Sequence, residues 1–535
     1  MKETRSKYTK TLLFPCLGYS ATAGFVSALL VTAFKYAAEL TVDASKKIYS
    51  FVISNPIWLP CLILGAGAIG LVASLLLSRS DSCRGGGIPT SVAAIRGLTG
   101  FNWILSIILL PFSALLTFFA GVPLGTEGPA VQMGTAVGDG VVRVLGGSKD
   151  RAWRRYIMTG GAAAGFSMAT GAPITAILFS MEELQKRFSP LLLTVASVSV
   201  VTSRITMHLL ALLGIGSESL FQIETFHTLP IKLVYAPILL GLACGMASIL
   251  FTLSYHEVDR LMKRVLKRLS TKIKFPIIFS LTALIGFFVS EILWSGHSLI
   301  DSLLETENIW YILIITLLVR ALLMMTANTA GVTGGIFLPT LAFGALIGAL
   351  LSDGLIAIGA LSADYKALMI VLGMVAFLGS TSRIPITASV LAIEALGGAN
   401  NIMFILLTVI IALLTVEASR LEDFTDTVIE AKLHAIHKGK EPLTVEVTLT
   451  VSGDSFAVGK NIKDLLWPAS CALISTEKAD GRKDSDTVSV GDKLTVIYKT
   501  YDPEATAEEF EWLVGDQPED IDRIMRPISK EKSII

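Results

Sequence analysis

The sequence predicts a mainly α-helical membrane protein with an internal duplication, followed by a small cytoplasmic α+β domain. Of its 535 residues, 52% are hydrophobic and 16% are charged, and the mean hydropathy is +0.66. Soluble domains are far less apolar. Apolar stretches of about 17 to 25 residues, the length that a helix needs to cross a bilayer, recur from about residue 11 to 419.

The apolar runs predict a series of helices, several of them shorter than a full span or broken by Gly and Pro. In the first half we expect helices at about 11–41, 51–78, 103–120, 130–145, 156–182 and 190–213. In the second half we expect them at about 232–256, 275–294, 310–327, 337–358, 365–380, 384–397 and 401–418. Because broken segments do not each cross the bilayer, this series does not fix the number of spans.

Landmarks in one register indicate the duplication. The motif Gly125–Pro129 (GTEGP) ends at position 129 and Gly335–Pro339 (GIFLP) at position 339, an offset of 210. The tetrapeptide Pro-Ile-Thr-Ala begins at 173 and again at 385, an offset of 212. Each copy is followed at the same distance by an acid and preceded by a glycine: Glu182 and Glu394, Gly161 and Gly373. Four landmarks in register predict two copies of one unit.

The distribution of basic residues predicts the orientation in the membrane. Basic residues gather at Lys2, Arg5, Lys7 and Lys10, in the loop 260–274 and in the segment 432–440. By the positive-inside rule all three face the cytoplasm, with 214–229 and 296–308 on the opposite side. The N-terminus lacks a cleavage site, so we expect the first helix to be retained. The prediction is a multi-pass protein of the cell (inner) membrane with both termini cytoplasmic.

Several classes of protein are disfavoured by what the sequence lacks. The five cysteines have no CxxC spacing and the six histidines are not paired, so we expect neither disulfides nor a metal site. Without an HExxH, GxSxG or Cys/His set, we expect no enzyme and no cofactor. The formal net charge is zero, which gives no indication of a nucleic-acid partner.

Glu127 is the first candidate functional residue. It lies between glycines where a helix starts within an apolar region, and the start of a helix carries unpaired N–H groups and partial positive charge. Those donors would hold a carboxylate or an inorganic anion. The pentapeptide alone fits a capping role equally well, but the second motif in register favours function. A third glycine-rich helix start at Cys83–Pro89, which alone would read as a flexible loop, suggests converging helix ends around one anion path.

These motifs resemble, in order, those of the CLC chloride channel and transporter family. Gly85–Pro89 (GGGIP) is similar to its GSGIP motif, Gly125–Pro129 to GxEGP, and Gly334–Pro339 (GGIFLP) to GxFxP. The resemblance covers residues 1 to about 436 and implies an inverted-repeat bundle of tilted and broken helices, a homodimer and one anion pathway per subunit. It implies Glu127 as external gate and, as anion-binding positions, Gly86, Gly87, Ile88, Gly128, Ile336, Phe337 and Leu338.

The resemblance also implies a proton route. Glu183 and Glu182, which follow the first Pro-Ile-Thr-Ala, are the candidate internal proton-relay residues, and Glu183 matches the internal proton glutamate of the family. Pure channels of the family usually lack that acid, so a chloride/proton antiporter is favoured over the alternative, a passive anion channel. The structural alternative is that both glutamates pair with Lys186 and Arg187. For Glu394 and Arg320 we expect buried structural pairing.

Two departures from the family pattern bear on selectivity and coupling. The serine whose hydroxyl donates to the central anion is Gly86 here, which leaves the preference between chloride and nitrate open, with chloride expected. The inner tyrosine should fall in the stretch Glu422–Asp426, which has none. There Thr425 would provide a hydroxyl and Phe424 the bulk, so Thr425 is a further candidate anion-binding residue. Loss of an inner constriction would loosen coupling.

The expected domains are 1–440, with repeat halves at about 11–213 and 232–419, then 441–502, and an acidic tail at 503–535. Alternation of apolar residues from Leu443 to Val451 predicts a half-buried strand, with a short helix at 462–466 and strands near 471–476 and 493–499. Val458–Ile462 and Val488–Leu494 resemble the TrkA-C (RCK-C) module, which implies dimerisation or sensing of a small ligand. The tail is expected to be partly disordered.

Overall fold

The computed structural model describes residues 14–85, 87–146, 148–215, 226–265, 269–305, 309–437, 442–468, 471–479, 486–517 and 526–527. Gly86 and the predicted basic N-terminus, residues 2–10, lie outside the described residues.

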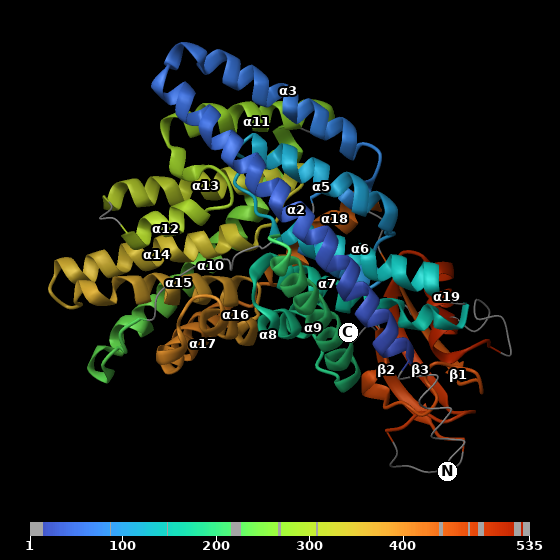
Figure 1. Ribbon diagram of the computed structural model, residues 1–535. Coiled ribbons are helices and arrows are strands. Elements are labelled where there is room, and N and C mark those ends of the chain that lie inside the picture. The colour runs from blue at the N-terminus through green and yellow to red at the C-terminus, as the bar shows by residue number, and fades with distance from the viewer. Residues whose placement is uncertain are drawn as a thin grey trace.

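Two consecutive sets of helices form the bundle (Figure 1). The first set is α2 (Phe14–Ser54), α3 (Leu59–Leu77), α4 (Ile88–Ile95), α5 (Trp103–Phe119), α6 (Glu127–Leu145), α7 (Arg154–Thr170), α8 (Pro173–Phe179) and α9 (Pro190–Leu212). The second is α10 (Tyr235–Val265), α11 (Thr271–Phe288), α12 (His297–Glu305), α13 (Trp310–Ala330), α14 (Phe337–Ala357), α15 (Lys366–Thr381), α16 (Pro385–Glu394) and α17 (Ile402–Ala418). In the described part of the chain, nine helices are long and apolar enough to cross a membrane. The predicted fold class is confirmed.

The duplication is visible in how matching helices pack. Helix α6 packs on α7 as α14 packs on α15. A Cβ atom on Gly134 would lie 2.1 Å from the carbonyl oxygen of Gly161, and one on Gly344 would lie 2.3 Å from that of Gly373. These two pairs are related by the same offsets, 210 and 212, that relate the sequence motifs. Glycine is needed at both crossings because no side chain fits between the backbones.

The structure corrects the predicted helix at 156–182, which is two helices. Helix α7 ends at Thr170, Gly171 follows with a left-handed φ of 77°, and α8 starts at Pro173. A glycine past the end of a helix and a proline at the start of the next are the usual terminators, and here they override a continuous apolar pattern. Helix α4 follows the glycine-rich helix start predicted at 83–89. Helix α12 and a further helix α18 (Phe424–Ile436) were not among the predicted helices, because each is shorter than a membrane span.

The small domain is a four-stranded antiparallel sheet of order β2-β3-β1-β4. Its strands are β1 (Leu443–Thr450), β2 (Cys471–Glu477), β3 (Lys493–Thr500) and β4 (Arg526–Pro527). Leu443 pairs with Thr500 and Thr450 with Lys493. Val445, Val447 and Leu449 are buried, as the alternation predicts.

Helix α19 (Pro503–Val514) lies in the segment that we predicted to be an acidic tail. It places Phe510 and Val514 in the core of the small domain, together with Val447 and Val496. Its acids lie away from that core: Glu504 is exposed, and Glu508 and Glu509 form ion pairs with Arg151 and Arg155, so the ordered domain continues beyond residue 502.

The small domain docks on the end of the bundle where α7 begins (Figure 1). The Tyr156 hydroxyl donates to the carbonyl of Asp464 and accepts from the amide of Leu466 at 3.1 Å. Arg187 donates to the carbonyl of Leu465 at 2.7 Å, and Ser189 donates to the carboxylate of Asp464 at 2.7 Å. The docked segment therefore contacts the connection between α8 and α9, which follows Glu183.

Candidate functional site: converging helix starts

The glycine motifs of the two halves meet in the middle of the bundle. Gly125 and Gly335 form an antiparallel bridge in which each N–H donates to the carbonyl of the other at 2.7 Å. A Cβ atom on Gly128 would lie 2.6 Å from Cα of Gly335 and 3.1 Å from Cα of Gly87. The three predicted motifs thus converge at one point, the glycine crossing, where α4, α6 and α14 begin.

Glu127 is fully buried at the first residue of α6. One carboxylate oxygen accepts a hydrogen bond from the Thr126 hydroxyl at 3.2 Å, and the other has no partner among the described residues. A buried carboxylate with an unpaired oxygen costs free energy. Within a membrane bundle such a group is a functional candidate.

A small cavity lies next to the glycine crossing. Its volume is about 10 Å³, roughly room for one water-sized particle. Helix α4 contributes Ile88, α14 contributes Ile336 and Phe337 at its start, and α18 contributes Thr425 from its first turn. The remaining wall is Phe179, Glu183, Thr340, Leu378, Ser382 and Ile384. The first amides of a helix have no acceptor within it, so the uncapped starts of α4 and α14 beside one cavity favour an anion.

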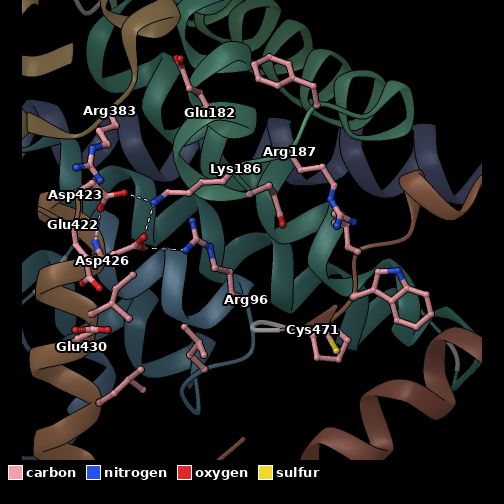
Figure 2. Close-up of a pocket in the computed structure, with 18 residues that line it drawn as sticks. Arg96, Glu182, Lys186, Arg187, Arg383, Glu422, Asp423, Asp426, Glu430 and Cys471 are labelled. Carbon is pink, nitrogen blue, oxygen red and sulfur yellow. Dashed lines mark hydrogen bonds and ion pairs between the residues drawn. The ribbon is translucent and has the colours of Figure 1, made fainter. Parts of the chain in front are cut away.

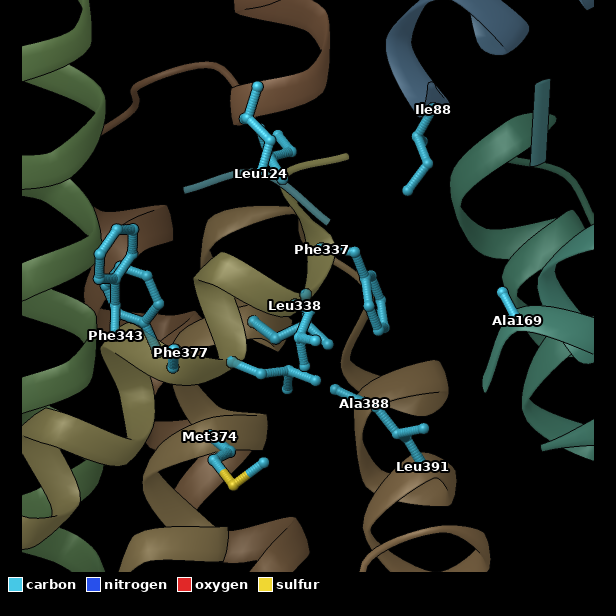
Figure 3. Close-up of a cluster of buried hydrophobic side chains, with 14 of the residues drawn as sticks. Ile88, Leu124, Ala169, Phe337, Leu338, Phe343, Met374, Phe377, Ala388 and Leu391 are labelled. Carbon is cyan, nitrogen blue, oxygen red and sulfur yellow. The ribbon is translucent and has the colours of Figure 1, made fainter. Parts of the chain in front are cut away.

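The predicted anion-binding residues divide into two groups. Ile88, Ile336, Phe337 and Thr425 line the small cavity, whereas Gly128 lies at the glycine crossing. In Figure 3, Phe337 lies on the side of α14 that faces Ala169 of α7, while Leu338 lies towards Ala388 of α16. The ring of Phe337 meets Phe166 of α7 edge to face, with centroids 5.0 Å apart. Gly86 lies outside the described residues.

The backbone of Gly87 has a protein partner. Its N–H donates to the side-chain oxygen of Gln132 at 2.8 Å, and the amide nitrogen of Gln132 donates to the carbonyl of Ser82 at 2.6 Å. Gln132 therefore ties the loop before α4 to α6 and occupies a donor that the sequence suggested for the anion.

Glu183 lies in a π-helical turn, Ser180–Leu184, directly after α8. It is 1% exposed, and one carboxylate oxygen accepts from the Thr425 hydroxyl at 2.5 Å. Its other oxygen has no partner among the described residues. The alternative pairing with the nearby bases is not seen, because Lys186 binds Asp423 and Asp426 and Arg187 binds the carbonyl of Leu465.

Glu182 and Glu394 cap each other's helices. Glu394 accepts from the amides of Ile174 and Thr175 at 2.9 and 2.8 Å, at the start of α8. Glu182 accepts from the amides of Ile386 and Thr387 at 3.1 and 2.7 Å, at the start of α16. The structural pairing expected of Glu394 is confirmed, and its partners are helix amides.

Arg320 also has a structural role. It is fully buried and donates to the carbonyls of four consecutive residues, Glu291 to Trp294, at 2.8 to 3.2 Å. The expected pairing is confirmed, but with backbone oxygens and not with an acid.

A larger cavity of about 800 Å³, the interdomain cavity, separates this site from the small domain (Figure 2). Lys186 donates to Asp423 and, at 2.6 Å, to Asp426, and Arg96 donates to Asp426 at 3.2 Å. Arg96 also donates to the backbone carbonyl of Glu183 at 3.1 Å. Asp426 lines the interdomain cavity and its neighbour Thr425 lines the small one, so little more than this layer separates the two.

Ser382 is a cavity residue that the sequence did not single out. It lies between α15 and α16, three residues before the second Pro-Ile-Thr-Ala, where Thr170 is its counterpart in the first half. The sequence signal for this residue was the hydroxyl side chain that both copies carry at the matching position. The structure describes no group of His, Cys, Asp and Glu residues that could hold a metal ion.

Comparison with known proteins agrees with this geometry. Two bacterial relatives are H(+)/Cl(-) exchange transporters ClcA: that of Vibrio campbellii is 28% identical over 75% of this chain and 85% of its own, and that of Vibrio cholerae is 27% identical over 74% and 85%. The fold is similar to a slow cyanobacterial Cl-/H+ antiporter (TM-score 0.71, 22% identity, 78% of this chain and 98% of that chain). It is also similar to a CLC-type fluoride/proton antiporter (TM-score 0.62, 21% identity, 75% and 95%). Residues 69–417 match the family described as voltage gated chloride channel, and the chain belongs to that family.

Proposed function

We propose that the protein is a chloride/proton antiporter in which Glu127 is the gate and Glu183 relays protons. The observation that carries this proposal is the small cavity, which joins the starts of α4 and α14 to Glu183 beside the glycine crossing. The names of the Vibrio relatives support the same activity.

The gate works by competition for positive helix ends. A chloride ion next to the amides of Ile336 and Phe337 is stabilised by the start of α14. The carboxylate of Glu127 lies at the start of α6, across the glycine crossing from the start of α14. It competes with chloride for this positive region as a tethered anion. Protonation neutralises Glu127 and lets a chloride ion take its place, so one proton is exchanged against anion occupancy.

On the inner side, Glu183 passes protons between the interdomain cavity and the gate. Thr425 donates its hydroxyl hydrogen to Glu183 while that acid is ionised. Once Glu183 is protonated, it donates to Thr425, whose own hydrogen then becomes available to a chloride ion in the small cavity. Thr425 thereby supplies the hydroxyl of the missing tyrosine. Glu182, held by the amides of α16, acts as a cap.

The cellular arrangement is part of the proposal. The positive-inside rule supports an inner-membrane protein with both termini and the small domain in the cytoplasm. The family resemblance supports a homodimer. The TrkA-C resemblance supports a small domain that dimerises or senses a small ligand, docked at the inner mouth of the pathway.

Reversal potentials in liposomes, with opposed chloride and proton gradients, test the proposal. Wild type should move protons against their gradient when driven by chloride. Glu127→Gln and Glu183→Gln should each abolish proton movement and leave chloride flux, while Glu257→Gln, an exposed surface glutamate, should leave both unchanged. If wild type moves chloride without protons, the protein is the alternative, a passive channel.

A further inference from the structure

Helix α2 buries a lysine that the transport scheme has not used. Lys35 is 9% exposed, and its ammonium donates to the carbonyl of Ala169 at 3.4 Å. Lys35 forms no ion pair with any residue that the structure describes. An ammonium group removed from water without an anionic partner costs several kcal/mol. Lysine normally avoids this cost by extending to the membrane surface, which Lys35 does not do.

The packing of α6 on α7 shows what lies opposite Lys35. Along this antiparallel pair, a Cβ atom on Gly138 would meet the carbonyl of Ile157, one on Gly134 that of Gly161, and one on Gly165 that of Ala130. Each turn back along α6 is matched by one turn forward along α7. One further turn brings Ala169 level with Thr126, the residue before Glu127. The ammonium held by Ala169 therefore lies at the level where α6 begins.

The charges around this point are few. Lys35 and Glu127 carry opposite charges, and His297 of α12 is a further titratable group near Glu127. Glu39 of α2 and Arg204 of α9 also act on Lys35. The ammonium adds a full positive charge to the partial charge of the α6 start.

We propose that Lys35 is a positioning residue for the gate: its ammonium favours the carboxylate form of Glu127 and thereby sets the pH at which protons open the pathway. This inference rests on the proposed role of Glu127. Without Lys35 the neutral form of Glu127 becomes more favourable, so the gate takes up protons at higher pH.

The test is the pH dependence of chloride efflux from liposomes for Lys35→Met, which keeps most of the length of the side chain and removes its charge. We expect the midpoint of activation to move upward by about one pH unit, a tenfold change in proton affinity. Lys35→Arg, which keeps the positive charge, should leave the midpoint of activation at its wild-type pH. Lys47→Met, an exposed lysine of the same helix, should leave it unchanged. If Lys35→Met cannot be purified as a dispersed protein, Lys35→Gln takes its place in the same measurement.

The same substitution in a Glu127→Gln background separates the possible outcomes. The pH shift should disappear there, because the group on which Lys35 acts no longer titrates. An unchanged midpoint in the single variant overturns the inference, and so does an equal loss of flux at every pH in both backgrounds, since that indicates packing or direct anion binding. Failure of the proposed function is distinguishable: Glu127→Gln with native Lys35 would still transport protons.

Discussion

The reciprocal caps of α8 and α16 make a sharp prediction about Glu182, which the sequence also suggested as a proton acid. In the structure each carboxylate accepts from two backbone amides of the other short helix, at 2.7 to 3.1 Å, and Glu394 also accepts from the Thr175 hydroxyl at 2.7 Å. We therefore expect Glu182→Gln and Glu394→Gln to act alike, although only Glu182 lies next to the proposed relay.

The expected magnitude follows from the hydrogen bonds lost. A hydrogen bond to a charged group contributes about 1.5–3 kcal/mol. Glutamine keeps one acceptor oxygen but turns its NH₂ group towards the second amide. The free energy of unfolding of each variant should therefore fall by about 2 kcal/mol. The two caps share no hydrogen bond but join the same two packed helices, so the double variant should lose more stability than either single variant.

The assay combines thermal unfolding of the purified protein in detergent with the liposome stoichiometry of protons and chloride. Both single variants should unfold at lower temperature by similar amounts and keep coupled transport, whereas the exposed Glu257→Gln should unfold as wild type does. A Glu182→Gln protein of wild-type stability that has lost proton transport would refute the capping role and assign Glu182 to the relay.

Three further predictions test the crossing, the small domain and selectivity. Gly128→Ala should destabilise the protein by about 1–3 kcal/mol in thermal unfolding, because the new methyl group would lie 2.6 Å from Cα of Gly335; Gly354→Ala, with open space around it, should not. Burial opposes ionisation of Asp492, but hydrogen bonds from Lys478, Ser489 and Ala479 outweigh it and hold its pKa below the usual range. That stabilisation is present above the unfolded pKa of about 3.9 and is lost as pH falls through the lower folded value; hydrogen exchange of β1 and β3 should therefore be faster in Asp492→Asn at pH 7 but converge with wild type in acid, with Asp486→Asn as the exposed control. Gly86→Ser should raise chloride flux relative to nitrate, and an unchanged ratio would show that a hydroxyl at this position does not select.

The repeat and the central residues could be predicted from sequence because glycine and proline have local meanings. The offsets of 210 and 212 reappear as the contacts Gly134–Gly161 and Gly344–Gly373. Partners distant in sequence could not be predicted. Gln132, which takes the amide of Gly87, and Lys35, which reaches Ala169, are single polar residues in apolar runs. Their role depends on helix crossings that no periodicity encodes, and α19 was missed because its charge resembles that of a solvated tail.

The distribution of carboxylates over the helix starts explains where an anion from solution would bind. Within the described part of the bundle, α6 begins with its own Glu127, α8 is capped by Glu394, α16 by Glu182 and α18 by Asp423, whose side chain accepts from the amide of Asp426 at 2.7 Å. Helices α4 and α14 begin with apolar residues, and both line the small cavity. Each capped start is already neutralised by a covalently attached anion. A mobile chloride ion is therefore stabilised most at the uncapped starts of α4 and α14. Among these capping acids, Glu127 lies next to the starts of α4 and α14 and has an unpaired carboxylate oxygen. Its carboxylate is therefore placed to exchange with a chloride ion there.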